Sequence, residues 1–256
     1  MTFSPSKTDP GTAMIIQARL GSTRLPGKVA CRLAGRPLIG HQVERLRAFG
    51  LLDRFPLIIA TTDNPADDAI ADIADEYGVA WFRGDEHDIT KRFIDAAQAF
   101  GIHQIIRLQG DDPLVDPRGI LAVYRAHRTG DYDLTTGAHK YGWILGTAAM
   151  VIEANALIRA WEITRAADPD RLSAGFAPFD PKFFNIHKIS PPADEIRNDL
   201  FLTVDYPEDF ELVSSVFLYF LRQEAGYRFE NRDIIAQCDR GAFTVNNRHL
   251  HQPFDE

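Results

Sequence analysis

The first half of the chain alternates short apolar runs with segments of helical spacing, and this alternation constrains the fold more than any other feature. The apolar runs predict buried strands at Met14–Ile16, Phe55–Ala60, Val79–Phe82 and Ile102–Leu108. The segments of helical spacing are Leu38–Phe49, Ala66–Tyr77, Ile89–Phe100 and Pro117–Arg128. Because strands and helices joined by short links wind into a parallel sheet with helices on both faces, we predict an α/β fold. Its ligand should lie beyond the carboxyl ends of the strands.

A cationic loop that contains glycine follows the first predicted strand. Its candidate binding residues are Arg19, Gly21, Ser22, Arg24, Gly27 and Lys28. Glycine lets backbone N–H groups approach an anion, arginine offers planar bidentate donors, and lysine supplies a compact charge. This set predicts a polyphosphate site, although the spacing is neither that of a Walker A motif nor that of the dinucleotide fingerprint. The alternative is a solvated basic loop.

Composition limits the partners and the compartment. The net charge of −8 over 256 residues argues against a nucleic-acid partner, which usually requires a basic face. Cys31 and Cys238 are far apart and have no metal spacing, so we expect reduced thiols in a cytoplasmic protein. No apolar run reaches the roughly 20 residues of a membrane-spanning helix, so we expect no membrane association. The polar residues 1–12 are expected to form a loose leader before a single domain at 13–256.

The second half of the chain is less regular. Its predicted strands are Asp133–Thr136, Gly146–Ile152, Phe183–Ile189 and Phe201–Val204. Its predicted helices are Ala154–Ala166, Pro207–Arg222 and Asn231–Gln237, and Asp168–Pro181 is predicted to be a loop or a broken helix. The sequence has no internal repeat or long linker. We therefore expect this half to extend the same domain with an antiparallel element that carries a second substrate.

Two carboxylates that follow predicted strands are candidate metal ligands. Asp111 comes shortly after the strand that ends at Leu108, and Asp205 directly follows the run Phe201–Val204. Carboxylates that face a phosphate loop commonly hold Mg²⁺, and polyphosphate chemistry uses both protein cations and a bridging metal. The alternative for each aspartate is a helix cap, because each stands near a proline. The histidines show no metal spacing, and we expect His249 and His251 to be solvated.

Three motifs in this order resemble the cytidylyltransferase family, whose members make CMP-sugars from acidic sugars such as 3-deoxy-manno-octulosonate and acylneuraminate. The motifs are QARLGSTRLPGK at Gln17–Lys28, QGDDP at Gln109–Pro113 and VDYPEDF at Val204–Phe210. Shorter stretches similar to the spore-coat polysaccharide branch are Ala60–Pro65, Phe82–Asp85 and Val245–Asn247. The resemblance implies the nucleotide-diphospho-sugar transferase fold: a Rossmann-like, mostly parallel sheet, helices on both faces, and a small antiparallel acceptor or dimerisation element.

The same resemblance implies how the domain at 13–256 is divided and how the loop acts. Residues 13–130 would form the nucleotide-binding half, 131–200 the acceptor side, and 201–256 would carry the metal-binding aspartate and the closing helices. Arg19, Gly21, Ser22, Arg24 and Lys28 would hold the phosphates of CTP. Arg19 and Lys28 would also take up charge on the leaving pyrophosphate.

The remaining implied roles concern the metal and the base. Asp111 and Asp205 would bind Mg²⁺, and with Arg19 and Lys28 they would form the catalytic set. Arg83, Gln109 and the backbone near Ala18 would read the cytosine edge, which suits an amide that both donates and accepts. For Arg83 a solvated loop cation is the alternative. Relatives are often dimers, so the resemblance also allows a homodimer, but the sequence does not set the oligomeric state.

The middle of the chain departs from the family pattern. Relatives carry an acidic pair in a Gly-Leu-Asp-Val-Glu-like strand and then an Arg-Glu-His-like turn. At the corresponding positions, in Ile144–Met150 and Pro169–Gly175, this chain has neither the expected carboxylates nor the histidine. Other candidates for contacting an acceptor are His139, Lys140, Tyr141 and Trp143, and the alternative for each is an exposed loop.

The leading hypothesis is therefore an Mg²⁺-dependent cytidylyltransferase that transfers CMP from CTP to a small acidic sugar and releases pyrophosphate, for the biosynthesis of surface polysaccharides. A second hypothesis keeps this chemistry but uses another nucleotide, or an acceptor that is not a sugar, such as a phosphonate or a polyol phosphate. A third is a subunit that binds a nucleotide without catalysing transfer.

Overall fold

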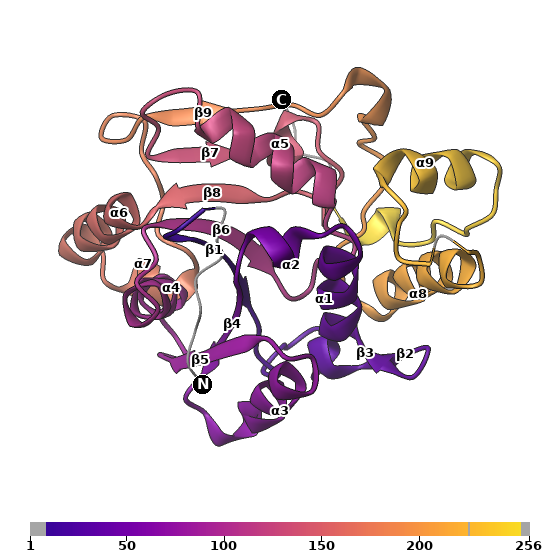
Figure 1. Ribbon diagram of the computed structural model, residues 1–256, viewed down its shortest axis with the longest axis horizontal. Coiled ribbons are helices and arrows are strands. Elements are labelled where there is room, and N and C mark those ends of the chain that lie inside the picture. The colour runs from indigo at the N-terminus through magenta and orange to yellow at the C-terminus, as the bar shows by residue number, and fades with distance from the viewer. Residues whose placement is uncertain (1–8, 225, 252–256) are drawn as a thin grey trace.

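A computed structural model describes residues 9–224 and 226–251, in which a seven-stranded sheet forms the centre of the molecule (Figure 1). The sheet order is β5-β4-β1-β6-β8-β7-β9. The strands are β1 (Thr12–Gln17), β4 (Leu57–Thr62), β5 (Ala80–Gly84), β6 (Gln104–Gln109), β7 (Leu134–Thr136), β8 (Met150–Glu153) and β9 (Ile186–Lys188). The pairs β5–β4, β4–β1, β1–β6 and β7–β9 are parallel, and β8 runs antiparallel to both β6 and β7. The sheet is therefore mostly parallel, as predicted.

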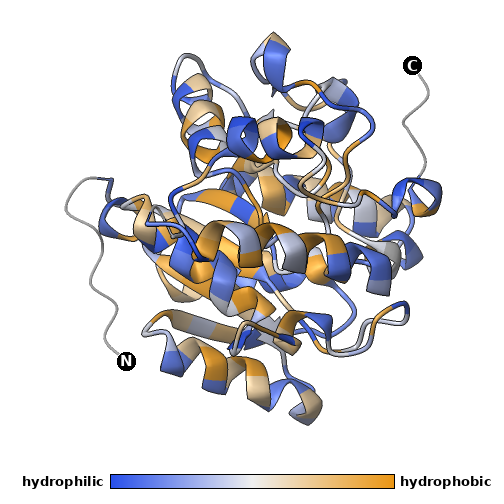
Figure 2. Ribbon diagram, turned by 90° about the vertical axis from the view of Figure 1, so that its right-hand side faces the viewer, coloured by the Kyte–Doolittle hydropathy of each residue, from blue (hydrophilic) through white to orange (hydrophobic). Residues whose placement is uncertain are grey.

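Alternate residues of the central strands explain why helices cover both faces. The helices against one face are α1 (Leu38–Ala48), α2 (Leu51–Arg54), α3 (Asp68–Glu76) and α5 (Pro117–His127), which share an apolar core with Met14, Ile16 and Ile106. Against the other face, α4 (Ile89–Ala99) and α6 (Ala154–Ala167) pack on Ile15, Ile58 and Ile105. Successive side chains of a strand point to opposite faces, so each central strand contributes to both cores. Figure 2 shows the resulting concentration of apolar residues in the sheet.

The C-terminal part of the chain forms a further apolar cluster beside α1 (Figure 1). Helices α8 (Pro207–Leu221) and α9 (Asn231–Asp239) pack there on residues such as Leu38, Leu114 and Leu202. The backbone N–H of Val204 donates to Asp111 O at 2.8 Å, and that of Leu202 to Leu145 O at 2.7 Å. These bonds hold the segment before α8 against the turn that follows β6.

Several short elements complete the fold. They are the antiparallel pair β2 (Arg32–Leu33) and β3 (Arg36–Pro37), helix α7 (Asp170–Ala174), and the 3₁₀ turns Lys28–Ala30, Pro65–Asp67, His139–Tyr141, Ala193–Glu195 and Arg248–Leu250. Helix α7 lies in the segment predicted to be a loop or a broken helix. Cys31 and Cys238 are free thiols, and none of the helices in the described parts of the chain is long and apolar enough to span a membrane.

Three of the predicted strands of the second half differ in the structure. The run Phe201–Val204 is not a strand, because it contains only an isolated bridge from Phe201 to Leu145. The strand expected at Gly146–Ile152 begins only at Met150. Gly146 has a φ of +93°, and a Cβ there would stand 2.2 Å from the Thr203 backbone nitrogen, so the chain turns closely past Thr203 instead of extending. Similarly, only Ile186–Lys188 of the expected Phe183–Ile189 is a strand.

The predicted leader at 1–12 is described only from residue 9. Asp9 accepts a hydrogen bond from the Tyr124 hydroxyl and lies 3.6 Å from Arg128 Nη1. Gly11 O accepts from the backbone N–H groups of His103 and Gln104, and Thr12 already belongs to β1. The described part of this segment is therefore bonded to the domain, and residues 1–8 lie outside the described residues.

Candidate active site

The cationic loop begins at the carboxyl end of β1. A carboxylate from the turn after β4, that of Asp67, holds it in place. Asp67 is buried and follows β4; its Oδ1 accepts the Leu20 N–H at 2.7 Å, and its Oδ2 accepts from the Thr62 hydroxyl. The loop closes on itself where Gly27 N donates to Leu20 O at 3.0 Å. Gly27 has a φ of +69°, a conformation that favours glycine, and leads directly into the turn that carries Lys28.

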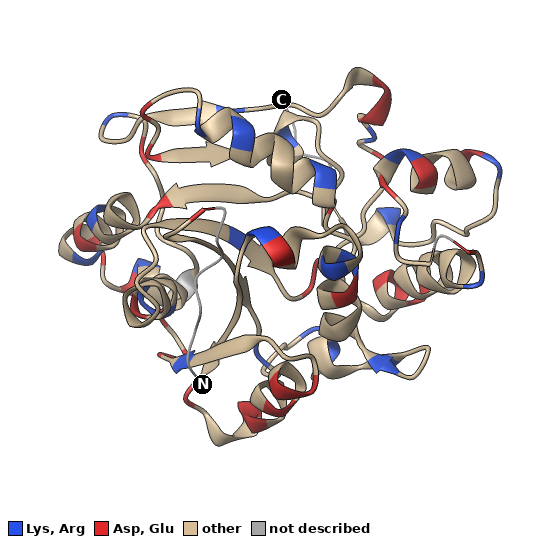
Figure 3. Cartoon of the chain, in the orientation of Figure 1, with Lys and Arg blue, Asp and Glu red and all other residues tan. Residues whose placement is uncertain are grey.

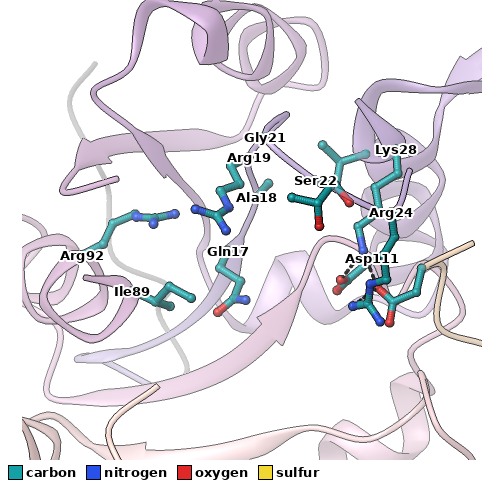
Figure 4. A pocket seen from close by; sticks show the side chains of 13 residues that line it. Gln17, Ala18, Arg19, Gly21, Ser22, Arg24, Lys28, Ile89, Arg92 and Asp111 are labelled. Atoms are coloured by element: carbon teal, nitrogen blue, oxygen red, sulfur yellow. Dashed lines mark hydrogen bonds and ion pairs between the residues drawn. The ribbon is translucent and has the colours of Figure 1, made fainter. Parts of the chain in front are cut away.

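Lys28 brings together two aspartates that are distant in the sequence. Its Nζ donates to Asp111 Oδ2 at 2.7 Å and to Asp205 Oδ1 at 2.8 Å, and Arg24 Nη2 lies 2.9 Å from the same Asp205 oxygen. Asp111 comes from the turn after β6, and Asp205 from the segment before α8. The convergence of these residues, which the sequence motifs predicted, is present in the structure (Figure 4).

The charges of this cluster support one another. Burial alone would lower the pKa of Lys28, but the charges and hydrogen bonds of Asp111 and Asp205 outweigh it and raise that pKa. The pKa of Arg24 is raised mainly by a hydrogen bond with Tyr206, and Asp205 adds to the rise. Both cations therefore stay charged at neutral pH. The surface of helix α3 has the opposite charge, since its exposed residues include Asp68, Asp72, Asp75 and Glu76 (Figure 3).

Asp205 is held in place by a buried network from the end of the chain. Asp209, which is fully buried, accepts the backbone N–H groups of Asp205 and Tyr206 at 2.9 Å each on Oδ2. Its Oδ1 accepts from Asn247 Nδ2 at 2.7 Å and His251 Nε2 at 2.8 Å. Burial raises the pKa of Asp209, yet these bonds outweigh it and lower that pKa. The expectation that His251 is solvated was wrong, because its side chain is only 7% exposed and stacks on Phe201.

The cluster forms one end of a pocket, and further cations form the other end (Figure 4). The lining residues that the sequence predicted are Ala18, Arg19, Gly21, Ser22, Arg24, Lys28, Asp111 and Asp205. Arg92 and Gln17 also line this pocket, and neither was predicted as a site residue. Arg92 is 1% exposed, and its Nε donates to Asp85 O at 3.0 Å. Arg92 lies on the buried face of α4 among apolar residues, so no local feature of the sequence indicated a binding role.

Arg83 lies outside this pocket. Its Nε donates to Thr62 O at 2.9 Å, its Nη2 to Asn64 O at 2.7 Å, and its Nη1 pairs with Asp68. The guanidinium therefore supports the turn after β4. A role in reading cytosine stays a prediction, and this placement does not favour it.

A second pocket lies beside the first, and Gln109 lines it. The Gln109 oxygen accepts from Arg107 Nη2 at 3.2 Å, and its nitrogen donates to Asp112 Oδ2 at 3.0 Å. Its amide is thus engaged by protein groups, and its contact with the base stays a prediction. Burial, assisted by the charge of Asp111, raises the pKa of Asp112 to about 7.

The second pocket also involves the segment that departs from the family pattern. His139 and Lys140 line it together with parts of the segment 144–150. Trp143 instead is buried, and its Nε1 donates to Ile189 O at 2.8 Å. Tyr141 is not among the lining residues. Of the four alternative acceptor contacts, the structure thus places two in this pocket.

Comparison with solved structures defines the class as a nucleotidyltransferase fold. A cytidylyltransferase from Leptospira borgpetersenii superposes with a TM-score of 0.78 at 25% identity, covering 96% of this chain and 99% of that one. A CMP:2-keto-3-deoxy-manno-octonic acid synthetase complexed with CTP superposes with a TM-score of 0.57 at 18% identity, covering 81% of this chain and 98% of the other. The second likeness concerns the fold alone.

Sequence comparison identifies the family. The model of the cytidylyltransferase family matches residues 13–239, so the chain belongs to this family and is a cytidylyltransferase. The spore coat polysaccharide biosynthesis protein SpsF of Bacillus subtilis is 34% identical over 84% of this chain and 87% of the relative. A 3-deoxy-manno-octulosonate cytidylyltransferase of Anaeromyxobacter dehalogenans is 35% identical over 65% of this chain and 68% of the relative.

Proposed function

We propose that the protein transfers CMP from CTP to a small acidic sugar, with Mg²⁺ bound, and releases pyrophosphate. The observation that carries this proposal is the contact of one ammonium, Lys28 Nζ, with both Asp111 and Asp205 at one end of a cation-lined pocket. Cations and carboxylates together at strand ends suit a triphosphate with a divalent metal. The names of the relatives support an acidic sugar as the acceptor.

The two carboxylates fit an Mg²⁺ ion whose remaining ligands come from the substrate and water. Mg²⁺ prefers oxygen ligands and is usually held by one or two carboxylates, with phosphates and water completing the shell. Asp111 and Asp205 supply two such carboxylates, with side chains 28% and 16% exposed, respectively. In the described residues no group of three His, Cys, Asp or Glu side chains could hold a metal alone. We therefore propose that Asp111 and Asp205 bind Mg²⁺ together with CTP.

In the proposed reaction an acceptor oxygen bonds to the α-phosphorus of CTP as the bond to the pyrophosphate oxygen breaks. Bound Mg²⁺ would neutralise phosphate charge as it shifts toward the leaving group. Lys28 and Arg24 would hold phosphate oxygens at one end of the pocket, and Arg19 and Arg92 would attract negative charge at the other. Such a site acts by positioning and by fixed charges, without a covalent intermediate on the enzyme.

The test measures pyrophosphate release from CTP and MgCl₂ with 3-deoxy-manno-octulosonate, its 8-amino-3,8-dideoxy analogue and N-acetylneuraminate as acceptors. We expect release with at least one acid, dependence on Mg²⁺, and a product that contains CMP by mass spectrometry. UTP, GTP and ATP serve as nucleotide controls. The proposal fails if the folded protein releases no pyrophosphate from CTP with any of these acceptors, whether or not CTP binds.

A further inference from the structure

The second pocket contains a cationic group for which the proposed CTP site has no use. Arg107, from β6, lines this pocket together with an apolar wall. Within the described residues its guanidinium has no carboxylate within the 4.0 Å of an ion pair. Its Nη2 donates to two neutral oxygens, Gln17 Oε1 at 3.1 Å and Gln109 Oε1 at 3.2 Å. Its Nη1 makes only a weak contact of 4.0 Å with Met150 Sδ, so this nitrogen has donor capacity to spare.

The aromatic rings of Phe176 and Phe93 hold the Arg107 guanidinium in position. Its central carbon lies 4.4 Å from the ring centroid of Phe176 and 5.8 Å from that of Phe93. Burial lowers the pKa of Arg107 to about 10, so the group remains charged at neutral pH. Stacking on a ring fixes the plane of a guanidinium and leaves its edge for hydrogen bonds. A charged, oriented and unpaired arginine in a pocket is suited to a bidentate anion.

The opposite wall offers little to a polar ligand. Its side chains include Ile144, Leu145, Ala148 and Ala149. Three of its carbonyl groups, those of Ile144, Leu145 and Ala149, are already bonded within the protein. Ile144 O accepts the Thr147 N–H at 3.1 Å and its hydroxyl at 2.9 Å. Leu145 O accepts from Leu202 N at 2.7 Å, and Ala149 O from Gly137 N at 3.2 Å. A ligand that fits here has an anionic end and an apolar part.

The two pockets are joined through amide side chains. Gln17 lines the first pocket and accepts a hydrogen bond from Arg107, which lines the second. Asp112 is the acidic side chain that lines the second pocket, and the Gln109 amide bonds to it and to Arg107, so this amide links the carboxylate to the guanidinium. A molecule bound at Arg107 would therefore lie next to the position proposed for the reacting phosphate.

We propose that Arg107 binds the anionic group of the acceptor, while an apolar part of the acceptor packs on the wall at Ile144–Ala149. This inference rests on the proposed function, because it assigns the second substrate of that reaction. A carboxylate and a phosphate monoester would both satisfy the guanidinium. Arg107 is thus a specificity-determining residue in the pocket that the altered segment 144–150 helps to line.

The experiment compares three kinds of acceptor in the pyrophosphate assay: 3-deoxy-manno-octulosonate, its uncharged methyl ester, and erythritol 4-phosphate. We expect wild-type protein to prefer one of the anions over the ester, with the preferred anion identifying carboxylate or phosphate as the group bound. In Arg107→Gln, kcat/KM for that anion should fall about 100-fold, mainly through KM, because a charged hydrogen-bond donor is lost. The CTP dissociation constant should change less than about 2-fold.

Two further variants make the result specific. Arg159→Gln removes another arginine stacked on an aromatic ring, 5.3 Å from the Phe184 centroid, and should leave acceptor KM unchanged. Ala148→Leu fills the pocket without altering charge, and should raise acceptor KM about 10-fold or more while CTP binding is retained. This second variant still tests the pocket if Arg107→Gln fails to fold.

Separate outcomes decide the two proposals. Transfer to the ester as readily as to the anions, or an anion KM that Arg107→Gln does not change, overturns the inference and leaves the proposed function intact. If CTP binds but no acceptor supports pyrophosphate release, the proposed function loses its support, and thermal shifts of the CTP-bound protein with each anion decide the inference. Stabilisation that disappears in Arg107→Gln supports it, whereas no stabilisation, or equal stabilisation in the variant, overturns it.

Discussion

The two pockets carry their charge in different ways. In the first, Lys28 and Arg24 are already paired with Asp111 and Asp205 at 2.7–2.9 Å. In the second, Arg107 is stacked on an aromatic ring and makes hydrogen bonds only to neutral groups among the described residues. A triphosphate with a bound metal carries charges of both signs. Cations can bind its phosphates while carboxylates bind the metal. In the second pocket, which Lys140 also lines, the oriented Arg107 cation beside an apolar wall instead selects one anionic group and one shape.

The pockets also differ in what supports them. The first pocket is fixed by a hydrogen-bond network, since Asp209 accepts the backbone N–H of Asp205 and is itself held by Asn247 and His251 from the C-terminal segment. The second is fixed by close packing, as where Gly146 passes the Thr203 backbone. A small displacement of a charged group that must contact the reacting atoms lowers the rate strongly. We therefore expect substitutions in the first pocket to affect kcat, and those in the second to affect acceptor KM.

The largest effect should come from Lys28→Met. Removal of the ammonium leaves Asp111 and Asp205 facing the pocket without their shared counterion, and it removes a donor for phosphate. We expect kcat/KM for CTP to fall about 1,000-fold, the upper range for losing one preorganised donor. Steady-state pyrophosphate release and calorimetric CTP binding measure this. Lys91→Met, which breaks the Lys91–Asp95 pair on α4, is the matched control and should remain active. Activity of Lys28→Met within about 10-fold of wild type would contradict the proposed charge cluster.

The next largest effect should come from Asp205→Asn, because it weakens one of the two proposed metal ligands and the Arg24 pair. We expect kcat to fall about 100-fold and the Mg²⁺ concentration for half-maximal rate to rise. Asp199→Asn, which alters a surface aspartate paired with Arg197, is the control. An unchanged Mg²⁺ dependence in Asp205→Asn would show that this carboxylate does not bind the metal.

The contrast between the pockets also explains what the sequence could predict. The strands, the cationic loop and Asp111 follow one another along the chain with strong local signals, so the parallel half of the fold was predicted closely. Asp205 was a candidate because it follows the apolar run Phe201–Val204, but that run is not a strand, and the link of Asp205 to Lys28 was supported by the third motif of the resemblance. No local pattern shows that residues so far apart meet, since their contact depends on how α8 packs beside α1.

The residues that sequence reasoning missed have a common reason. Arg92 lies within an apolar helix pattern and Arg107 within an apolar strand pattern. A charged residue in such a pattern gives no sign of a binding role. Only the sheet register shows that Arg107 pairs with Ile15, two residues before Gln17, and therefore reaches the pocket face. His251 was misjudged because a histidine near the chain end is usually exposed, whereas here a buried carboxylate binds it. A cation inside an otherwise apolar strand that ends at a ligand site is the signal that could have found Arg107.

A smaller effect should follow from His251→Gln, which tests whether the long-range network supports the first pocket. The loss of one hydrogen bond to the buried Asp209 should destabilise the fold by about 1–2 kcal/mol. For a chain of this size that lowers Tm by roughly 2–8 °C. Because Asp209 positions Asp205, we also expect kcat to fall about 5-fold with acceptor KM unchanged. His249→Gln is the control, and a fall in acceptor KM or no change in kcat would contradict this positioning role.

The smallest effect on nucleotide binding should come from Arg83→Gln, because Arg83 lies outside the first pocket. This variant compares a residue outside the pocket with those that line it. Its ion pair is with Asp68, whose side chain is exposed, and its bonds to the Thr62 and Asn64 carbonyls support a turn. We expect a loss of about 1 kcal/mol, or roughly 2–4 °C in Tm. CTP and UTP dissociation constants, measured by calorimetry, should each change less than about 2-fold. Weakened CTP binding with unchanged UTP binding would instead mean that Arg83 reaches the cytosine edge when nucleotide is bound, and that the first pocket extends beyond β5.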